Sequence, residues 1–229
     1  MGRIGSVLGV LAMVVALGVT GPATAQGTDE SLDKRLADAG RVYRELFASP
    51  DSSVPQELLQ RCRCVAVLPH VVKGAFVWGA RFGSGVMSCR DSAGAWGPPC
   101  FVNLKGGSFG LQIGAEASDV VLFFMTDRGA KSLMTGSQFT LGGDASVAAG
   151  PVGRTGEAST DLKLNAEIYS YARAKGLFAG LSLAGARFTA DTKANARYYG
   201  RPVSVKQLLF ERKAPAVPAG AQEFLKVLP

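Results

Sequence analysis

The sequence contains one histidine, His70, and only four cysteines among 229 residues. A single histidine gives no pair for a metal site, and its position at a predicted strand end is more often structural than catalytic. The segment 79–85 lacks the Gly-Lys-Ser/Thr ending of a phosphate-binding loop. We therefore expect a protein that is not an enzyme and has no cofactor and no metal. A lipid hydrolase that uses carboxylates of the 144–167 segment is an alternative that composition leaves open.

Long apolar runs are scarce as well. Residues 4–19 form the longest run, after Arg3 and before the small-residue site Ala23-Thr24-Ala25. This pattern predicts a secretory signal peptide over residues 1–25, so the mature chain would begin at Gln26 and lie in the periplasm or at the envelope surface. An uncleaved anchor is the alternative, although the run is short for a span of about 20 residues.

Glycine, by contrast, is abundant, with 29 residues that separate short apolar segments without a fixed repeat. Six short strands are predicted, at 64–68, 75–81, 85–89, 100–104, 109–113 and 120–125. Their spacing favours an antiparallel meander that closes into a sandwich or barrel-like sheet. With an amphipathic helix before it and short helices after it, the expected fold is α+β and rich in β-strands.

The four cysteines, Cys62, Cys64, Cys89 and Cys100, lie close together in the sequence. An even number in an oxidising compartment indicates disulfides, with three possible connectivities. Cys89 and Cys100 flank a turn-rich segment, so a cross-strand bridge between them is our candidate pairing. Cys62 and Cys64 share one strand face, which disfavours a bond between them, and they are alternative partners for the other two. A zinc site fits this spacing poorly.

Charge is distributed unevenly along the chain, whose net charge is +7. The first part of the mature chain is acidic. The segment 61–100 has one acidic residue, Asp91, and five basic ones, Arg61, Arg63, Lys73, Arg81 and Arg90. Such a distribution favours a basic face for an anionic partner. The alternative is an ordinary solvated surface.

The stretch 144–180 has glycine- and proline-marked corners, and an apolar-polar alternation from Leu162 predicts a strand, a turn and a second strand. Together with Trp96-Gly97-Pro98-Pro99, the segment 106–114 and Tyr198-Tyr199-Gly200, it resembles the SYLF domain, a lipid-binding family whose yeast members also bind actin. The resemblance extends over roughly residues 32–200. We assign residues 26–211 to one SYLF-like domain with a β-rich core at 62–200, and residues 212–229 to a Pro- and Gly-containing tail.

Residues 28–48 form the clearest predicted helix, since apolar residues recur at steps of three and four. The SYLF resemblance makes this helix a candidate for membrane contact through Leu36, Tyr43 and Phe47. Its four basic and five acidic residues do not give the basic polar face of a surface-lying membrane helix. Packing against the sheet is therefore the favoured alternative.

The resemblance and the basic segment together predict a non-enzymatic domain that recognises anionic phospholipid headgroups. The candidate contact residues are Lys73, Arg81, Arg90, Arg154 and Lys175. The predicted signal peptide points to phospholipids of a bacterial envelope and argues against actin as a partner. Nucleic acid is not expected, because no reader motif is present. The alternative is a structural or protein-interaction scaffold that binds an envelope protein and no lipid.

Overall fold

The computed structural model describes residues 29–48, 54–75, 78–109, 114–136, 138–151, 165–174, 177–214 and 216–229. The strands are β1 (Cys64–Ala75), β2 (Trp78–Cys89), β3 (Cys100–Phe109), β4 (Gly114–Phe124), β5 (Gln138–Thr140), β6 (Val147–Ala149), β7 (Ile168–Ala174), β8 (Leu177–Gly180) and β9 (Arg187–Ala190). The helices are α1 (Glu30–Ala48), α2 (Gln56–Arg61), α3 (Asp127–Gly136), α5 (Thr192–Tyr198), α6 (Val205–Leu209) and α7 (Ala219–Leu225).

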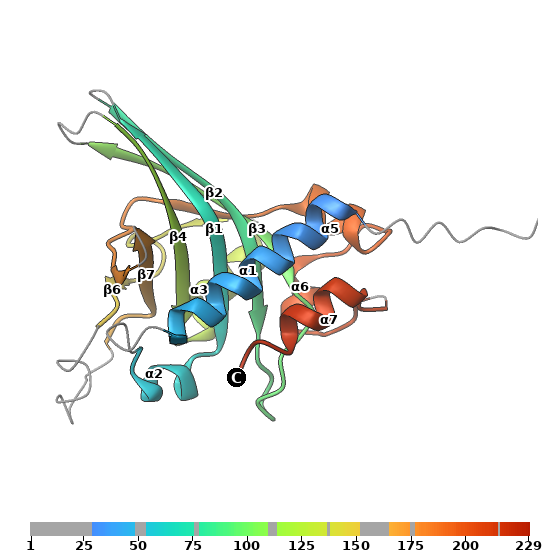
Figure 1. Ribbon diagram of the computed structural model, residues 1–229. Coiled ribbons are helices and arrows are strands. Elements are labelled where there is room, and N and C mark those ends of the chain that lie inside the picture. The colour runs from blue at the N-terminus through green and yellow to red at the C-terminus, as the bar shows by residue number, and fades with distance from the viewer. Residues whose placement is uncertain are drawn as a thin grey trace, which may run out of the picture.

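These strands form one sheet that curls into a half-barrel, with α1 lying across one face (Figure 1). The order is β5-β9-β3-β2-β1-β4-β7-β6, and β8 pairs with β7. The named strands pair antiparallel, except that β6 and β7 run parallel. The expected α+β, β-rich fold is confirmed. The chain departs from a simple meander after β3, because β4 pairs with β1.

The central strands β1 to β4 are longer than the sequence pattern predicted, so the expectation of six short strands is wrong. The expected turn signals Pro69 and Gly83 lie inside β1 and β2. A Cβ atom at Gly83 would meet the side chain of Val71, and the register of β1 against β2 shifts between Val67 and Val72. Glycine here allows two strands to approach closely at a bulge, so it does not end the strand.

Helix α1 packs its apolar face on the sheet and on α7. Leu36 and Tyr43 are buried, so neither is available for the membrane contact considered above. Phe47 is 42% exposed and stacks against Tyr43 at 4.9 Å between ring centroids. The favoured alternative, packing against the sheet, is the observed one, because the apolar stripe of the helix faces the apolar residues of β1 and β2.

An aromatic cluster is formed by Phe124, Phe139 and Phe188, whose ring centroids lie 5.5–6.2 Å apart. These rings come from β4, β5 and β9, so they tie distant parts of the chain into one core. Two of the short helices that follow are capped. Asp191 accepts a hydrogen bond from the backbone of Ala194 at 3.0 Å, and Ser204 begins α6 with a capping box.

The described residues of the stretch 144–180 include β6, β7 and β8, so the two strands expected near its end are confirmed. Gly150 lies against the ring of Tyr171, where a Cβ atom would collide with the ring. The Tyr171 hydroxyl donates to the carbonyl of Pro151 at 2.9 Å. The Gly-Pro corner therefore provides room for a buried tyrosine on the neighbouring strand. Leu162, also part of the predicted alternation, lies outside the described residues.

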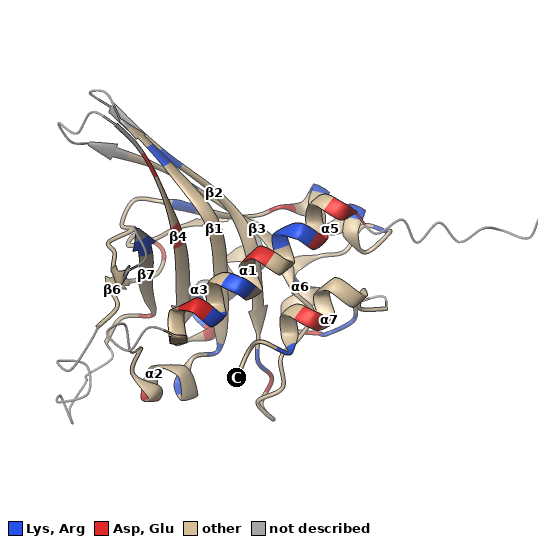
Figure 2. Ribbon diagram, in the orientation of Figure 1, with Lys and Arg blue, Asp and Glu red and all other residues tan. Residues whose placement is uncertain are grey.

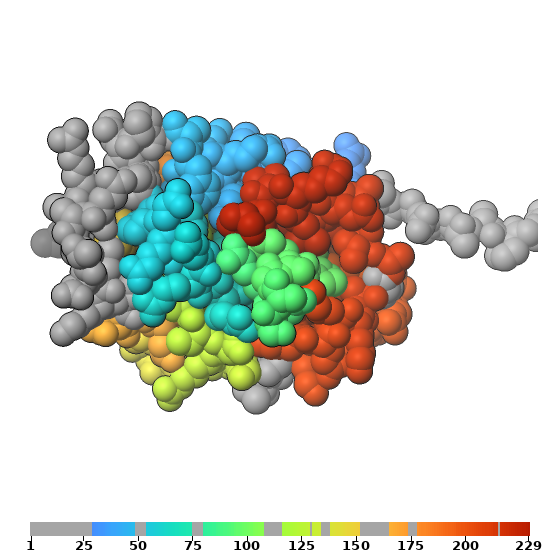
Figure 3. Space-filling model, turned by 90° about the horizontal axis from the view of Figure 1, so that it is seen from below, coloured from blue at the N-terminus to red at the C-terminus, as the bar shows by residue number. Residues whose placement is uncertain are grey.

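The C-terminal segment, expected to be a tail, forms α7 and packs on α1. Ala221 and Phe224 are buried. The indole nitrogen of Trp96 donates to the carbonyl oxygen of Pro229 at 2.6 Å. In Figure 3 the C-terminal segment lies between α1 and the loop that precedes β3. The last residues are thus part of the folded domain.

The disulfide joins Cys64 to Cys89, so the candidate pairing of Cys89 with Cys100 is wrong. Antiparallel pairing places Cys64 directly opposite Cys89, with Cα atoms 4.0 Å apart. Cys100 lies opposite Met87, two residues from the position it would need. The register of β2 with β1 and with β3 therefore explains why Cys89 bonds to Cys64 and not to Cys100. Cys62 and Cys100 are free thiols, and both are buried.

Candidate functional site

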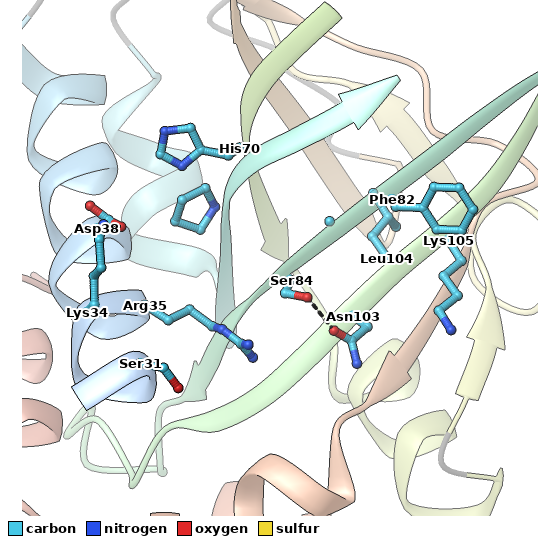
Figure 4. A pocket seen from close by; sticks show the side chains of 12 residues that line it. Ser31, Lys34, Arg35, Asp38, His70, Phe82, Ser84, Asn103, Leu104 and Lys105 are labelled. Atoms are coloured by element: carbon cyan, nitrogen blue, oxygen red, sulfur yellow. Dashed lines mark hydrogen bonds and ion pairs between the residues drawn. The ribbon is translucent and has the colours of Figure 1, made fainter. Parts of the chain in front are cut away.

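A pocket of about 520 Å³ lies between the first half of α1 and the strands β1, β2 and β3. Its walls come from segments far apart in the sequence, and side chains from α1 and from the sheet face each other across it (Figure 4). This volume falls in the range of small-molecule sites. The pocket is therefore the candidate binding site of the described part of the chain.

The helix side of the pocket contributes Lys34, Arg35 and Asp38. Lys34 donates a hydrogen bond to Asp38 at 2.7 Å, and this bond is the largest cause of a lowered pKa of the Asp38 carboxyl. Arg35 lies over the ring of Phe101, 5.6 Å from its centroid, and its Nη1 atom is 3.7 Å from a carboxylate oxygen of Asp191. Lys34 is thus paired locally, whereas Arg35 has no hydrogen bond to another described residue.

The sheet side of the pocket contributes Phe82 and Ser84 from β2, and Asn103 and Lys105 from β3. The antiparallel register pairs Phe82 with Lys105 and Ser84 with Asn103, so the four side chains share one face. The Ser84 hydroxyl donates to Asn103 Oδ1 at 2.7 Å. Phe82 is 56% exposed. The arrangement combines a cation, an amide and an exposed aromatic ring.

A chain of ion pairs holds α1 in place beside this pocket. Arg173 of β7 donates to Asp119 of β4 at 2.8 Å and also pairs with Glu45 of α1. Asp119 in turn accepts from the backbone N–H of His70, which has a positive φ of 54° at the bulge in β1. His70 itself lines the pocket. The network fixes the distance between the helix wall and the sheet wall.

The candidate contact residues Lys73 and Arg81 lie directly opposite each other on β1 and β2. Lys73 is also opposite Glu116 of β4, so a carboxylate accompanies the two cations. Burial is the main cause of a lowered pKa of Arg81, and Glu116 opposes it. Figure 2 shows basic residues where the hairpin of β1 and β2 extends past α1. Lys73 and Arg81 are thus adjacent cations on the hairpin, and neither lines the pocket.

Arg90 lies at the opposite end of β2 and is held by structural contacts. It donates to the carbonyls of Leu59 at 3.2 Å and Pro229 at 3.0 Å, and its guanidinium lies 4.5 Å from the ring centroid of Trp96. The structure therefore separates Arg90 from Lys73 and Arg81. The other two candidates, Arg154 and Lys175, lie outside the described residues.

Sequence reasoning missed the pocket residues Lys34, Arg35 and Lys105. One available signal was the pair of polar residues Asn103 and Lys105. They alternate with apolar residues in the strand, which indicates that one face of the strand is not covered by the core. The helix cations gave no such signal, since charged residues occur all along α1 (Figure 2). Only the docking of α1 brings them to the sheet.

Metal chemistry finds no support in the residues that the structure describes: they contain no cluster of three or more His, Cys, Asp or Glu side chains that could hold an ion. Burial raises the pKa of the two free thiols, to about 11 for Cys62 and about 12 for Cys100. Neither thiol is therefore an activated nucleophile at neutral pH. Within the same residues, no helix has the length and apolar character needed to cross a membrane.

The fold and the pocket define a class of protein: an α+β domain in which one amphipathic helix lies over a basic, aromatic-edged pocket on a curled sheet. The particular family is equally clear. A family model described as "Ysc84: Las17-binding protein actin regulator" matches residues 105–229. The chain belongs to this family, which confirms the SYLF resemblance.

Similar proteins are found in animals and yeast. The chain is 32% identical over 197 residues to SH3 domain-containing YSC84-like protein 1 of Rattus norvegicus, covering 85% of this chain and 57% of that protein. It is 32% identical over 206 residues to Protein YSC84 of Saccharomyces cerevisiae, covering 86% of this chain and 43% of that protein. The chain thus spans about half the length of the curated relatives it matches.

These names correct one expectation. We argued against actin as a partner, yet the family is described as an actin regulator. A further relative, 33% identical over 180 residues and covering 78% of this chain and 39% of its own length, is named LAS seventeen-binding protein 3 of Saccharomyces cerevisiae. These descriptions contradict the expectation that actin is an unlikely partner, and that expectation is withdrawn.

Proposed function

We propose that this protein is a non-enzymatic domain that binds anionic phospholipid surfaces through the end of the β1–β2 hairpin that extends past α1. The observation that carries the proposal is the pair Val72 and Phe82, which lie opposite each other and are 47% and 56% exposed. Large exposed apolar side chains beside cations are typical of surfaces that contact a membrane interface.

The cations stand in positions that suit this role. Lys73 and Arg81 form the next pair along the hairpin, and their side chains point to the opposite face. Lys105 lies opposite Phe82 on β3. Each cation near an anionic surface contributes about 1 kcal/mol, so three together support attachment that weakens with salt. With the hairpin entering edge-on, the apolar pair would reach the interface on one face of the sheet, while Lys73 and Arg81 would contact phosphates on the other.

Co-sedimentation of residues 26–229 with vesicles tests the proposal. We expect binding to phosphatidylglycerol-containing vesicles that fades between low and high salt, and none to neutral vesicles. Reversing the charges of Lys73 and Arg81 should weaken binding by roughly tenfold or more. The matched control reverses Arg61 and Lys226, which are exposed on α2 and after α7. Equal loss in both double variants, or no binding at low salt, contradicts the proposal.

The proposed location is the periplasm or the envelope surface, since the predicted signal peptide supports export. Residues 1–28 lie outside the described residues. The test is N-terminal sequencing of the protein isolated from cells that express the whole chain. Cleavage after Ala25 supports export, whereas an intact N-terminus in the cytoplasm contradicts it.

A second candidate function is recognition of an actin-regulating protein partner, which the family description favours. In this case the exposed hairpin would contact protein in place of lipid. Sedimentation with actin filaments, and capture by the Las17 protein named in that description, would separate the two functions. Binding to either one that survives charge reversal of Lys73 and Arg81, with no vesicle binding, would replace the lipid proposal.

A further inference from the structure

We propose that the pocket between α1 and the sheet binds a phosphate monoester group. The first argument is charge. Three cations, Lys34, Arg35 and Lys105, line the pocket together with one carboxylate, Asp38, so the lining side chains carry a net charge of +2 with histidine counted as neutral. A second carboxylate, Asp191, lies 3.7 Å from Arg35 outside this lining. A phosphate monoester is close to a dianion at neutral pH, whereas a carboxylate or a phosphodiester has a single charge. The dianion is therefore the better electrostatic match.

The second argument is the unfilled hydrogen-bonding capacity of Arg35. Its guanidinium is a fork of N–H donors that matches phosphate oxygens, yet none of them donates to another described residue. Its Nη1 atom is buried without a hydrogen-bond partner, and the Asp191 oxygen at 3.7 Å is beyond hydrogen-bond distance. Figure 4 shows Arg35 extending from α1 toward Ser84 and Asn103. Because Nη1 itself is buried, a bound anion would supply acceptors to the other N–H groups of the fork, where Arg35 lines the pocket.

The third argument is the position of the uncharged groups. The hydrogen bond from Ser84 engages the oxygen of the Asn103 amide, so the amide nitrogen points away from Ser84. Asn103 and Lys105 are two residues apart on one strand face, and both line the pocket. An amide donor and an ammonium group therefore stand on the sheet wall opposite the Arg35 fork. This distribution suits the several oxygens of a phosphate.

The size of the pocket and its aromatic edge define what the phosphate is attached to. A volume of about 520 Å³ exceeds that of a bare phosphate and leaves room for a small organic group. The exposed ring of Phe82 forms an apolar edge on the side of the hairpin. We therefore infer a phosphate monoester with a short apolar or glycerol-like substituent, whether free in solution or carried as a lipid headgroup.

Titration of the whole mature chain with glycerol 3-phosphate, followed by calorimetry, tests the inference without a membrane. Glycerol is the control ligand. Arg35→Gln should weaken binding roughly tenfold, because a charged hydrogen bond is lost. Lys105→Gln should weaken binding by roughly fivefold. This second variant keeps the inference testable if Arg35→Gln disturbs the packing of Arg35 on Phe101. The matched control is Lys131→Gln, an exposed lysine of α3 that does not line the pocket.

Vesicles distinguish the two sources of the phosphate. Phosphatidic acid has a monoester headgroup, and phosphatidylglycerol has a diester. Tighter binding to phosphatidic acid that requires Arg35 and Lys105 assigns the pocket to a lipid headgroup. Binding of glycerol 3-phosphate without that preference assigns it to a soluble ligand. Either result supports the inference.

The inference is overturned if glycerol 3-phosphate does not bind and phosphatidic acid has no advantage, or if Arg35→Gln and Lys105→Gln bind as the unchanged protein does. This failure is separate from failure of the proposed function, which is measured with phosphatidylglycerol vesicles and the Lys73 and Arg81 variants. If the protein binds phosphatidylglycerol vesicles but its pocket binds no phosphate monoester, the proposed membrane contact through the β1–β2 hairpin still stands.

Discussion

Arg173 and Asp119 form a nearly buried ion pair between β7 and β4, joined by two hydrogen bonds of 3.1 and 2.8 Å to one carboxylate oxygen. The other oxygen accepts from the backbone of His70 at 3.1 Å. A single carboxylate therefore fixes the bulge of β1, the neighbouring strand and, through Arg173, the end of α1. The helix wall of the pocket depends on a residue that does not line it.

Asp119→Ala should lower the free energy of unfolding by about 2 kcal/mol, because the His70 amide loses its acceptor and Arg173 keeps only Glu45 as a partner. Urea denaturation measures this change. Asp127→Ala is the control, since Asp127 forms exposed pairs with Arg63 and Lys131 and should cost less than about 1 kcal/mol. Similar losses of unfolding free energy in the two variants would show that the Asp119 network stabilises the protein no more than an exposed ion pair does.

Replacing both Cys64 and Cys89 with alanine should lower the free energy of unfolding by about 3 kcal/mol, since the disulfide closes a loop with a sequence separation of 25. Chemical denaturation under non-reducing conditions measures the loss. Cys100→Ala breaks no disulfide and serves as the comparison. Peptide mapping that finds Cys89 joined to Cys100 would contradict the register of β1 and β2.

The thiols of Cys62 and Cys100 should resist iodoacetamide in the native state. Both are buried, and burial raises their pKa values to about 11 and about 12, so little reactive thiolate forms at pH 8. Mass spectrometry should detect two alkylated cysteines only after denaturation. Rapid labelling of the folded protein at either position would disprove this expectation.

Gly85→Ala should destabilise the domain by about 2 kcal/mol or more, because the added Cβ would lie 2.7 Å from the Cα atom of Leu68 and collide with the Val67 carbonyl. Backbone atoms of β1 cannot move aside as a flexible side chain could. The control is Gly74→Ala, where no atom lies within 4 Å of the new Cβ. Thermal unfolding compares the two, and equal midpoints would argue against the close approach of β1 and β2.

Acid should weaken helix α1 itself through Asp38, which pairs with Lys34 one turn earlier in the same helix. Hydrogen bonding from Lys34 is the main cause of its lowered pKa, so this pair contributes stability above the ordinary aspartate value of 3.8. That contribution is lost as the pH falls below 3.8 through the lower folded-state value. Asp38→Asn should therefore reduce the loss of unfolding free energy between pH 5 and about pH 2. An unchanged pH dependence in this variant would contradict the assignment.

Local patterns in the sequence determined the elements whose signals are short-range. The periodicity of α1, the caps at Asp191 and Ser204, and the corner at Gly150 are all visible in residues a few positions apart. The family followed from the same kind of evidence, because its motifs are contiguous segments. The α+β, β-rich class could therefore be predicted before any contact was known.

Only the tertiary structure decided how those elements meet. Glycines such as Gly83 predict turns when considered alone, but the neighbouring strand makes them points of close contact inside long strands. The register of β1 against β2 selected Cys64 as the partner of Cys89. The pocket exists because the docking of α1 brings Arg35 to a sheet face with Lys105, and no local pattern records a contact between residues so far apart in the chain.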